Sequence, residues 1–335
     1  MTNKTLNSLF GVAAKEGAKR IVISGSKNGP SFSYHLPSGE EAIFNLPKKL
    51  ETNLASNLRQ LLKIAPGELS TGKYCKLNNK NYQLNFRLSI IPDELGEKII
   101  INVIDEKEKI MSLTKLGLQK TELNIIKNKI KVKSGLIVIS SAERQGRSTT
   151  LRSLLTELDR DNKNIYFIGS ETKLKLDGVN YLDNKTENWD KLLQHDSDII
   201  IVDVKGEDCL QKSILAASTG RLVIISLETI NALEALYKII NSGLPLKLIL
   251  DNLKMITNQE LVNLKRQKTK SKIERQKIGL FEIIIPNNAM HSFITNNEKD
   301  LKTEDFWKQL FQLATNNGYK PLIMDKDQKK HDGLI

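Results

Sequence analysis

From Gly135 onwards the chain alternates short apolar runs with segments whose apolar residues recur every three or four positions. The runs predict strands, and the spaced residues predict helices that cover them. The expected strands are 135–140, 164–168, 198–202, 222–226 and 279–285, and the expected helices begin at Ser148, span 209–217 and include Phe306, Leu310 and Leu313. Because such continuous apolar strands are buried on both faces, the pattern predicts an α/β domain with a mainly parallel sheet.

The pattern before residue 105 is different, because short alternating runs are separated by glycine, proline and asparagine. Strands are expected at 20–24, 32–35, 82–88 and 98–104. Leucines at helical spacing predict one helix between Leu50 and Leu62, and the first twenty residues indicate a short amphipathic helix. We therefore expect an N-terminal α+β domain over 1–105, a linker over 106–118 and the α/β domain over 119–335.

The composition excludes several classes of protein. The chain of 335 residues is 39% hydrophobic, and none of its apolar runs approaches the roughly 18 residues that a membrane-spanning helix needs. Cys75 and Cys209 stand apart from other metal ligands, so neither a disulfide framework nor a zinc site is expected. The net charge of +12 is spread along the chain without interleaved aromatic residues, which argues against a nucleic-acid partner. We expect a cytoplasmic protein.

One stretch has the layout of a phosphate-binding loop. SSAERQGRSTT, residues 140–150, lies between an expected strand and an expected helix, where the pattern G-x-x-x-x-G-K-[ST] would belong. The positions that match are Gly146, Ser148 and Thr149. The first glycine is replaced by Ser141, a customary glycine by Arg144 and the lysine by Arg147, and Glu143 adds a negative charge. The sequence thus predicts the fold of a nucleotide site with altered chemistry.

A series of short motifs resembles, in its order, the family of hexameric secretion ATPases that drive type IV pilus assembly and type II secretion. The motifs are Ile90-Ile-Pro-Asp-Glu-Leu-Gly-Glu-Lys98, Leu116-Gly-Leu118, Gly135-Leu-Ile-Val138, Asp196-Ser-Asp-Ile-Ile-Ile-Val202, Ala216-Ala-Ser-Thr-Gly220, Leu222-Val223 and Gly279-Leu-Phe-Glu282. The resemblance covers nearly the whole chain. It implies a PAS-like N-terminal domain followed by a RecA-like P-loop NTPase domain, ATP and Mg²⁺ as cofactors, and assembly into homo- or hetero-oligomers.

At the positions that carry chemistry, the chain departs from this family. The family's Gly-Glu after the Asp-x-Asp strand corresponds to Asp203-Val204, and its two motif histidines correspond to Arg221 and Glu228. The acidic residues left as candidates for catalysis are Asp203, Glu207 and Glu171. Because phosphoryl transfer depends on several groups acting together, these changes predict a catalytically impaired member, a pseudo-ATPase.

The resemblance also places a degenerate nucleotide site at Ser141, Gly146, Arg147, Ser148, Thr149 and Arg87. Ser148 is the Mg²⁺ ligand implied if nucleotide binds, although a serine at a helix start is also an ordinary cap. The position of a second arginine expected near nucleotide is Asn102. Asp196 and Asp198 precede an apolar run, so we expect them to cap the strand, and no metal site is predicted.

Three functions are open at this point. The first is a non-hydrolysing subunit that joins an active secretion-type ATPase or another component of a pilus or secretion machine, at the inner face of the membrane through its partners. The second is a slow ATPase in which Arg147 replaces lysine and Asp203 or Glu207 acts at the metal. The third is a basic module that binds nucleic acid or membrane. The altered motifs favour the first function, and they do not distinguish pilus assembly from secretion.

Overall fold

The computed structural model describes residues 2–25, 29–36, 40–47, 56–60, 64–65, 70–79, 82–94, 96–104, 110–169, 175–182, 189, 192–194, 196–265 and 277–335. These residues form two compact units, the first up to residue 104 and the second from residue 110. Residues 105–109 of the expected linker, and Glu171, lie outside the described residues.

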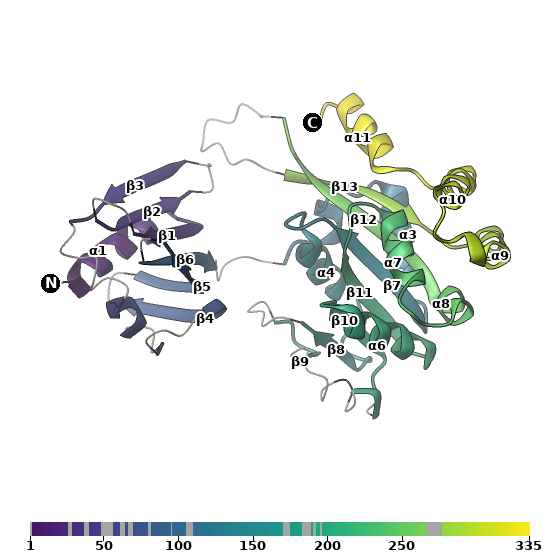
Figure 1. The fold of residues 1–335 in the computed structure, drawn as a ribbon, viewed down its shortest axis with the longest axis horizontal. Coiled ribbons are helices and arrows are strands. Elements are labelled where there is room, and N and C mark those ends of the chain that lie inside the picture. The colour runs from purple at the N-terminus through teal and green to yellow at the C-terminus, as the bar shows by residue number, and fades with distance from the viewer. Residues whose placement is uncertain are drawn as a thin grey trace. The chain divides into compact units, whose positions relative to one another are not determined.

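The first unit is a six-stranded antiparallel sheet with strand order β3-β2-β1-β6-β5-β4, accompanied by one long helix, α1 (Figure 1). The elements are α1 (Thr2–Lys15), β1 (Arg20–Ser24), β2 (Ser31–His35), β3 (Glu41–Asn45), β4 (Ser70–Asn79), β5 (Tyr82–Asp93) and β6 (Gly96–Ile104). Phe10 of α1 meets Phe32 of β2 edge to face, with ring centroids 5.9 Å apart, and both are buried. The apolar face of α1 therefore closes the core of this sheet.

The strands predicted at 20–24, 32–35, 82–88 and 98–104 are confirmed, as is the amphipathic helix at the N-terminus. Strands β3 and β4 were not predicted. Both are edge strands of the sheet, and β3 is mostly exposed, so it lacks the alternation of apolar residues that marks a half-buried strand. Strand β4 buries Cys75 and Leu77, but most of its other residues are polar, which hides this short alternation. Of the helix predicted between Leu50 and Leu62, the structure describes residues 56–60, which are helical.

The second unit is built on a seven-stranded sheet with strand order β13-β12-β7-β11-β10-β8-β9. Its strands are β7 (Gly135–Ser141), β8 (Ile165–Ile168), β9 (Val179–Leu182), β10 (Ile199–Asp203), β11 (Leu222–Glu228), β12 (Leu253–Asn263) and β13 (Lys277–Ile284). All neighbouring strands are parallel except β13, which is antiparallel to β12. The predicted α/β class and mainly parallel sheet are confirmed.

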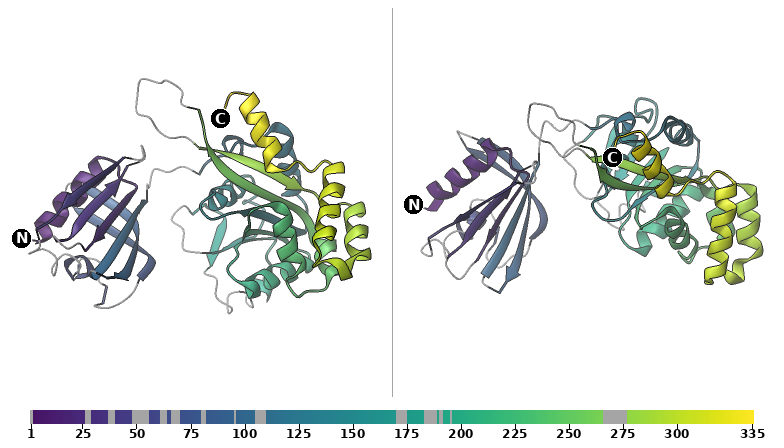
Figure 2. Two further views of the ribbon diagram at one scale, coloured as in Figure 1. Left: turned by 45° about the horizontal axis from the view of Figure 1, so that its top comes forward. Right: turned by 90° about the horizontal axis from the view of Figure 1, so that it is seen from above.

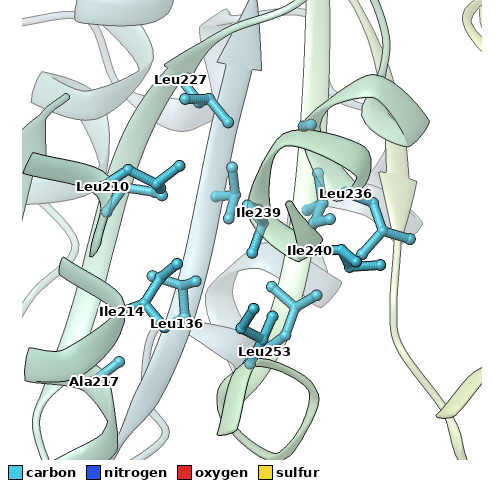
Figure 3. Close-up of a cluster of buried hydrophobic side chains, with 14 of the residues drawn as sticks. Leu136, Leu210, Ile214, Ala217, Leu227, Leu236, Ile239, Ile240 and Leu253 are labelled. Carbon is cyan, nitrogen blue, oxygen red and sulfur yellow. The ribbon is translucent and has the colours of Figure 1, made fainter. Parts of the chain in front are cut away.

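Helices cover both faces of this sheet. They are η2 (Leu113–Lys115), α3 (Lys120–Lys129), α4 (Arg147–Leu155), α6 (Glu207–Ser218), α7 (Ala232–Ile240), α8 (Leu246–Asn252), α9 (Asn288–Asn296), η3 (Glu298–Asp300), α10 (Glu304–Asn316) and α11 (Leu322–His331). On one face, Ile214 of α6 and Ile239 of α7 pack with Leu136 of β7 (Figure 3). On the other, leucines of α4 pack with Ile137 and Ile139 of β7. Strand β7 is buried throughout, which explains its unbroken apolar run.

Residues 113–118, expected in the linker, pack with the second unit. Leu113 and Leu116 are buried in the core shared with α3 and α4, and the carbonyl of Leu116 accepts a 2.8 Å hydrogen bond from the amide of Gly279. Their apolar side chains are removed from water in this position, which a solvated linker would not achieve.

Two buried carboxylates, those of Glu282 and Asp325, form hydrogen bonds that connect the C-terminal segment to β13 and to the starts of α3 and α7. Helices α9 and α10 lie side by side and α11 lies against β13 (Figure 2). Glu282 of β13 accepts hydrogen bonds from the amide of Ala232 at the start of α7, from the amide of Leu322 at the start of α11 and from the hydroxyl of Tyr319. One carboxylate therefore satisfies donors at two helix N-termini, where negative charge is also favoured by the helix dipole.

The second carboxylate is Asp325 of α11. It accepts hydrogen bonds of 2.9 Å from the side-chain amide of Gln119 and from the backbone amide of Phe281, and it forms a buried ion pair with Lys329 one turn later. Gln119 is the N-cap residue of α3. Asp325 thus joins α11, β13 and the start of α3 through a single side chain.

Candidate functional site

The loop between β7 and α4 keeps the backbone of a phosphate-binding loop. Strand β7 ends at Ser141 and α4 begins at Arg147, each within one residue of the boundary predicted from the sequence. Arg144 and Gly146 have φ angles of 61° and 85°, in the left-handed region. Glycine adopts this region freely, whereas a residue with a Cβ pays about 1–2 kcal/mol for it. The loop therefore retains a glycine-type turn at Arg144 although the glycine is absent.

The backbone amides of this loop face no acceptor. Within the part of the chain that the structure describes, the amides of residues 143–148 make no hydrogen bond. Successive unpaired amides at the start of a helix form a concave nest with positive potential, which suits an anionic group. The backbone of this loop consequently fits a phosphate group.

Strand β12 holds the loop in this shape. The side-chain amide of Gln259 donates to the carbonyl of Gln145 at 2.6 Å, and its oxygen accepts from the hydroxyl of Thr150 at 2.5 Å. The amide of Leu261 in turn donates to the side chain of Gln145 at 2.8 Å. A Cβ at Gly146 would lie 3.1 Å from the side-chain nitrogen of Gln259, so a larger residue there would force this side chain to shift. These contacts fix both sides of the loop.

Arg147, at the lysine position of the pattern, contacts two neighbouring residues, Ser141 and Glu228. Its side chain is only 19% exposed, and one terminal nitrogen donates a 2.9 Å hydrogen bond to the carbonyl of Ser141. The other terminal nitrogen lies 3.9 Å from a carboxylate oxygen of Glu228, at the end of β11. Strand register explains this pairing, because Glu228 lies directly opposite Ser141. Arg147 and Glu228, which the resemblance aligns with the loop lysine and the second motif histidine, therefore carry complementary charges 3.9 Å apart.

The other charged residues of the loop point elsewhere. Glu143 and Arg144 are 74% and 84% exposed and lie 3.5 Å from each other. Of the three charged residues that depart from the pattern, Arg147 alone has a side chain that is mostly buried. Ser148 is exposed in the first turn of α4, and Thr149 is partly buried.

Asp203 lies at the carboxyl end of β10, two strands from β7. Its carboxylate accepts a hydrogen bond from the hydroxyl of Ser226, its register partner on β11. Ser226 in turn lies opposite Ile139 of β7, so Asp203 is at the same end of the sheet as the phosphate loop. Glu207 is exposed in the first turn of α6, where its charge suits the helix dipole. Asp203 is the better placed of the two acidic candidates.

Arg221 and Asp198 serve the opposite end of the sheet. The guanidinium of Arg221 donates to the Ser197 hydroxyl, the Thr219 hydroxyl and the Leu193 carbonyl. Asp198 accepts from the backbone amide of Asn164, and this bond, together with the ammonium of Lys163, lowers the pKa of its carboxyl. Both residues brace the start of β10, which agrees with the capping role predicted for Asp198.

The remaining candidate, Arg87, belongs to the first unit. Arg87 is exposed on β5 of the first unit, directly opposite Asn102 of β6, the two positions that the resemblance relates to nucleotide. Among the described residues, histidine, cysteine and acidic side chains form no group of three suited to a metal ion. No helix in the described part of the chain is long and apolar enough to cross a membrane.

The site fits a phosphate group in its backbone but not in its side chains. The amides of the loop are unpaired, yet the guanidinium of Arg147 is bound to Ser141, and the resemblance aligns Val204 with the glutamate of the family's Gly-Glu. We therefore derive no reaction step through ATP.

Sequence reasoning missed the contacts that hold the site. Gln145 and Gln259 belong to segments far apart in the chain, and the stretch Thr257–Glu260 is polar although the first three of its residues are buried. Arg147 and Glu228 are likewise distant in sequence. The appearance of opposite charges at two altered motif positions was the only signal available for that pair.

Comparison with known proteins agrees with the fold and the motifs. The family described as "Type II/IV secretion system protein" matches residues 2–322. The chain is 24% identical over 269 residues to the putative type II secretion system protein E of Escherichia coli K12, covering 77% of this chain and 55% of that protein. It is 23% identical over 291 residues to the type IV pilus assembly ATPase PilB of Acinetobacter baylyi, covering 84% and 50%. The chain thus spans about half the length of these curated relatives.

Solved structures show the same architecture. The Legionella pneumophila ATPase DotB superposes with a TM-score of 0.72 at 15% identity, covering all of this chain and 94% of DotB. The pilus retraction motor PilT with bound ADP superposes with a TM-score of 0.71 at 17% identity, covering 98% and 93%. These superpositions establish a shared fold, an N-terminal domain followed by a RecA-like domain. Together with the family match over residues 2–322, they show that the chain belongs to the type II/IV secretion system protein family.

Proposed function

We propose that this chain is a non-hydrolysing member of its family that acts as a structural or regulatory subunit of a pilus or secretion machine. It assembles with an active secretion-type ATPase or with other components of the same machine. It works in the cytoplasm and is held at the inner face of the membrane through these partners. Whether the machine builds pili or secretes proteins is left open by the proposal.

The observation that supports this function best is the engagement of Arg147. A guanidinium that is bound to the Ser141 carbonyl and lies beside Glu228 is not free to follow charge that develops on a transferring phosphate. Arginine also presents a broad planar group where a compact ammonium is needed. Because transfer relies on several such groups together, the loss of the glutamate at Val204 and of both histidines compounds the effect.

The retained parts of the chain are those that shape a subunit. The buried strands, the Ala216–Gly220 helix end and the packed C-terminal helices all persist, while the residues tied to chemistry have changed. Heterologous contacts close a ring without requiring every site in it to react. A protein selected for assembly and released from catalysis would retain this combination of features.

A slow ATP-hydrolysing motor is the second candidate, and family membership fits it equally well. It is favoured by Asp203, whose carboxylate lies at the same end of the sheet as the loop, and by the exposed hydroxyl-bearing residue Ser148. In this case Asp203 would act at Mg²⁺ and Ser148 would be a ligand. The two candidates differ in turnover and not in assembly, so one experiment is needed for each.

Assembly is tested by affinity capture of the tagged protein from its native cells, with mass spectrometry of what co-purifies. We expect a secretion-type ATPase or a pilus or secretion component that stays bound at about 0.5 M salt, where exposed charges are screened. A tagged cytosolic protein of similar net charge is the control. Recovery of nucleic acid or lipid alone, lost on adding salt, would instead favour a basic binding module.

A further inference from the structure

A pocket of about 250 Å³ lies in the second unit, away from the phosphate loop. Its residues come from α3, from the end of β13, from α9 and from the segment that follows α10. Because β13 is antiparallel to β12, its carboxyl end lies with the amino ends of the parallel strands. The phosphate loop follows the carboxyl end of β7, so the two sites are at opposite ends of the sheet.

The wall of the pocket is mostly apolar. It is formed by Ile125, Ile283, Ile284, Ile285, Met290, Ala314, Gly318 and Tyr319. The polar groups at its margin are Gln119, Thr121, Glu122, Asn317 and Lys320. A cavity of about 150 Å³ already accommodates benzene, whereas drug-sized ligands need roughly 300 Å³ or more. The pocket therefore has room for one long side chain or a small organic cation, and not for a nucleotide.

Glu122 places a carboxylate beside this apolar wall, and one of its two oxygens has no partner among the described residues. One of its oxygens accepts a 2.8 Å hydrogen bond from the amide of Gln119, which completes a capping box at the start of α3. Within the described residues its other oxygen has no hydrogen-bond partner, and no cation lies within ion-pair distance. The capping contact fixes the carboxylate in place while leaving half of its bonding capacity unused.

The surroundings make the charged form of Glu122 costly. The pKa of Glu122 is raised to about 7, mainly by burial and in smaller part by the nearby Asp325, while the Gln119 amide, Lys329 and Lys320 oppose the shift. Lys329 is committed to its ion pair with Asp325, and Lys320 is exposed at the margin of the pocket. A cation placed against the free oxygen would relieve the cost of burying the charge.

We propose that this pocket binds an alkylguanidinium or alkylammonium group, such as the end of an arginine or lysine side chain, with its methylenes against the isoleucines and its cation on Glu122. A long basic side chain places apolar methylenes next to a charged head, and the pocket places an apolar wall next to a carboxylate. The site is independent of the phosphate loop and of whether the protein hydrolyses ATP.

The proposal is tested by titrating the whole protein with n-butylguanidinium, which stays charged at every pH used. Binding is followed by NMR of labelled isoleucine methyl groups, so that Ile125, Ile283 and Ile285 report its location. The key variant is Glu122→Gln, because glutamine also completes a capping box and preserves α3. Glu304→Gln, which changes an exposed carboxylate on α10, is the matched control.

We expect n-butylguanidinium to shift the methyl signals of the pocket. The dissociation constant should be about tenfold lower at pH 8 than at pH 6, because a carboxyl with a pKa near 7 becomes about tenfold more ionised over that interval. Glu122→Gln should raise the dissociation constant at pH 8 by about tenfold, the loss of one charge-assisted contact, and abolish the pH dependence. Uncharged n-butanol should show no pH dependence.

A further probe distinguishes the two sources of such a cation. Tighter binding of N-acetyl-arginine-methylamide than of n-butylguanidinium would point to a protein side chain, and equal or weaker binding to a small free molecule. Equal affinity of n-butylguanidinium for the wild type and Glu122→Gln, or shifts confined to methyl groups outside the pocket, would overturn the proposal.

Discussion

The buried ion pair of α11 gives the sharpest prediction about stability. Replacing Asp325 by asparagine leaves the ammonium of Lys329 buried without a counter-charge, and it weakens the bonds from Gln119 and Phe281. Breaking a buried pair by removing one partner costs about 3–5 kcal/mol. We therefore expect Asp325→Asn to lower the free energy of unfolding of the second unit by about 4 kcal/mol.

Urea unfolding followed by tryptophan fluorescence measures this quantity. The chain has two tryptophans, Trp189 and Trp307, and both belong to the second unit, so the signal is not mixed with unfolding of the first. The matched control is Asp327→Asn, which disrupts an exposed pair with Lys330 on the same helix and should cost less than about 1 kcal/mol.

A double-mutant cycle separates the pair from its surroundings. Asp325→Asn combined with Lys329→Met removes both charges, so the double variant should be more stable by about 2 kcal/mol than the two single effects predict. The reasoning would be refuted if Asp325→Asn stayed within about 0.5 kcal/mol of the wild type, or if the two single effects were additive.

Three further predictions concern Glu122, Gln259 and Arg144. The pKa of Glu122 is about 7 in the folded state and near 4.5 in the unfolded state, so the folded state binds the extra proton between these values. The free energy of unfolding should therefore fall as pH rises from about 4.5 to 7. Urea unfolding of Glu122→Gln at several pH values should show a flatter dependence on pH, and an unchanged slope would contradict this. Gln259→Ala leaves the Gln145 carbonyl and the Thr150 hydroxyl unpaired, so it should destabilise the second unit by about 1–3 kcal/mol. It should also speed hydrogen exchange of the Thr149, Thr150 and Leu261 amides, which are hydrogen-bonded to this loop, and unchanged exchange would remove the role assigned to β12. The backbone at Arg144 is left-handed, so Arg144→Gly should alter the free energy of unfolding by less than about 0.5 kcal/mol, and Arg144→Val should lower it by about 1–2 kcal/mol. Equal effects of the two substitutions in urea unfolding would argue against that geometry.

How much of the fold was predictable depended on burial. Strands β7, β10 and β11 are covered on both faces and therefore read as unbroken apolar runs. Strand β12 was missed because it carries Thr257, Asn258 and Gln259, whose polar side chains are buried next to the phosphate loop and are not placed by periodicity. A strand that supports a site is in this way less visible than one that supports only the core.

The candidate site was predictable in position and not in contacts. The layout of strand, loop and helix located the loop between Ser141 and Arg147, because local pattern decides where a strand ends and a helix begins. What Arg147 binds depends on strand register, which brings Glu228 opposite Ser141. The exposure of Glu143 was also beyond the sequence, since nothing local fixes the direction of a loop side chain.

Steady-state ATP hydrolysis in the presence of Mg²⁺ tests the central claim most directly, with the wild type, Ser148→Ala and the double variant Arg147→Lys, Glu228→His compared at equal concentration. Ser148→Ala removes the hydroxyl implied as a metal ligand, and the double variant restores the residues that the family resemblance gives to both partners of the charge pair. We predict that the wild type turns over no faster than Ser148→Ala. Turnover by the wild type that is clearly above background and is abolished in Ser148→Ala would contradict the account and identify the chain as a working motor.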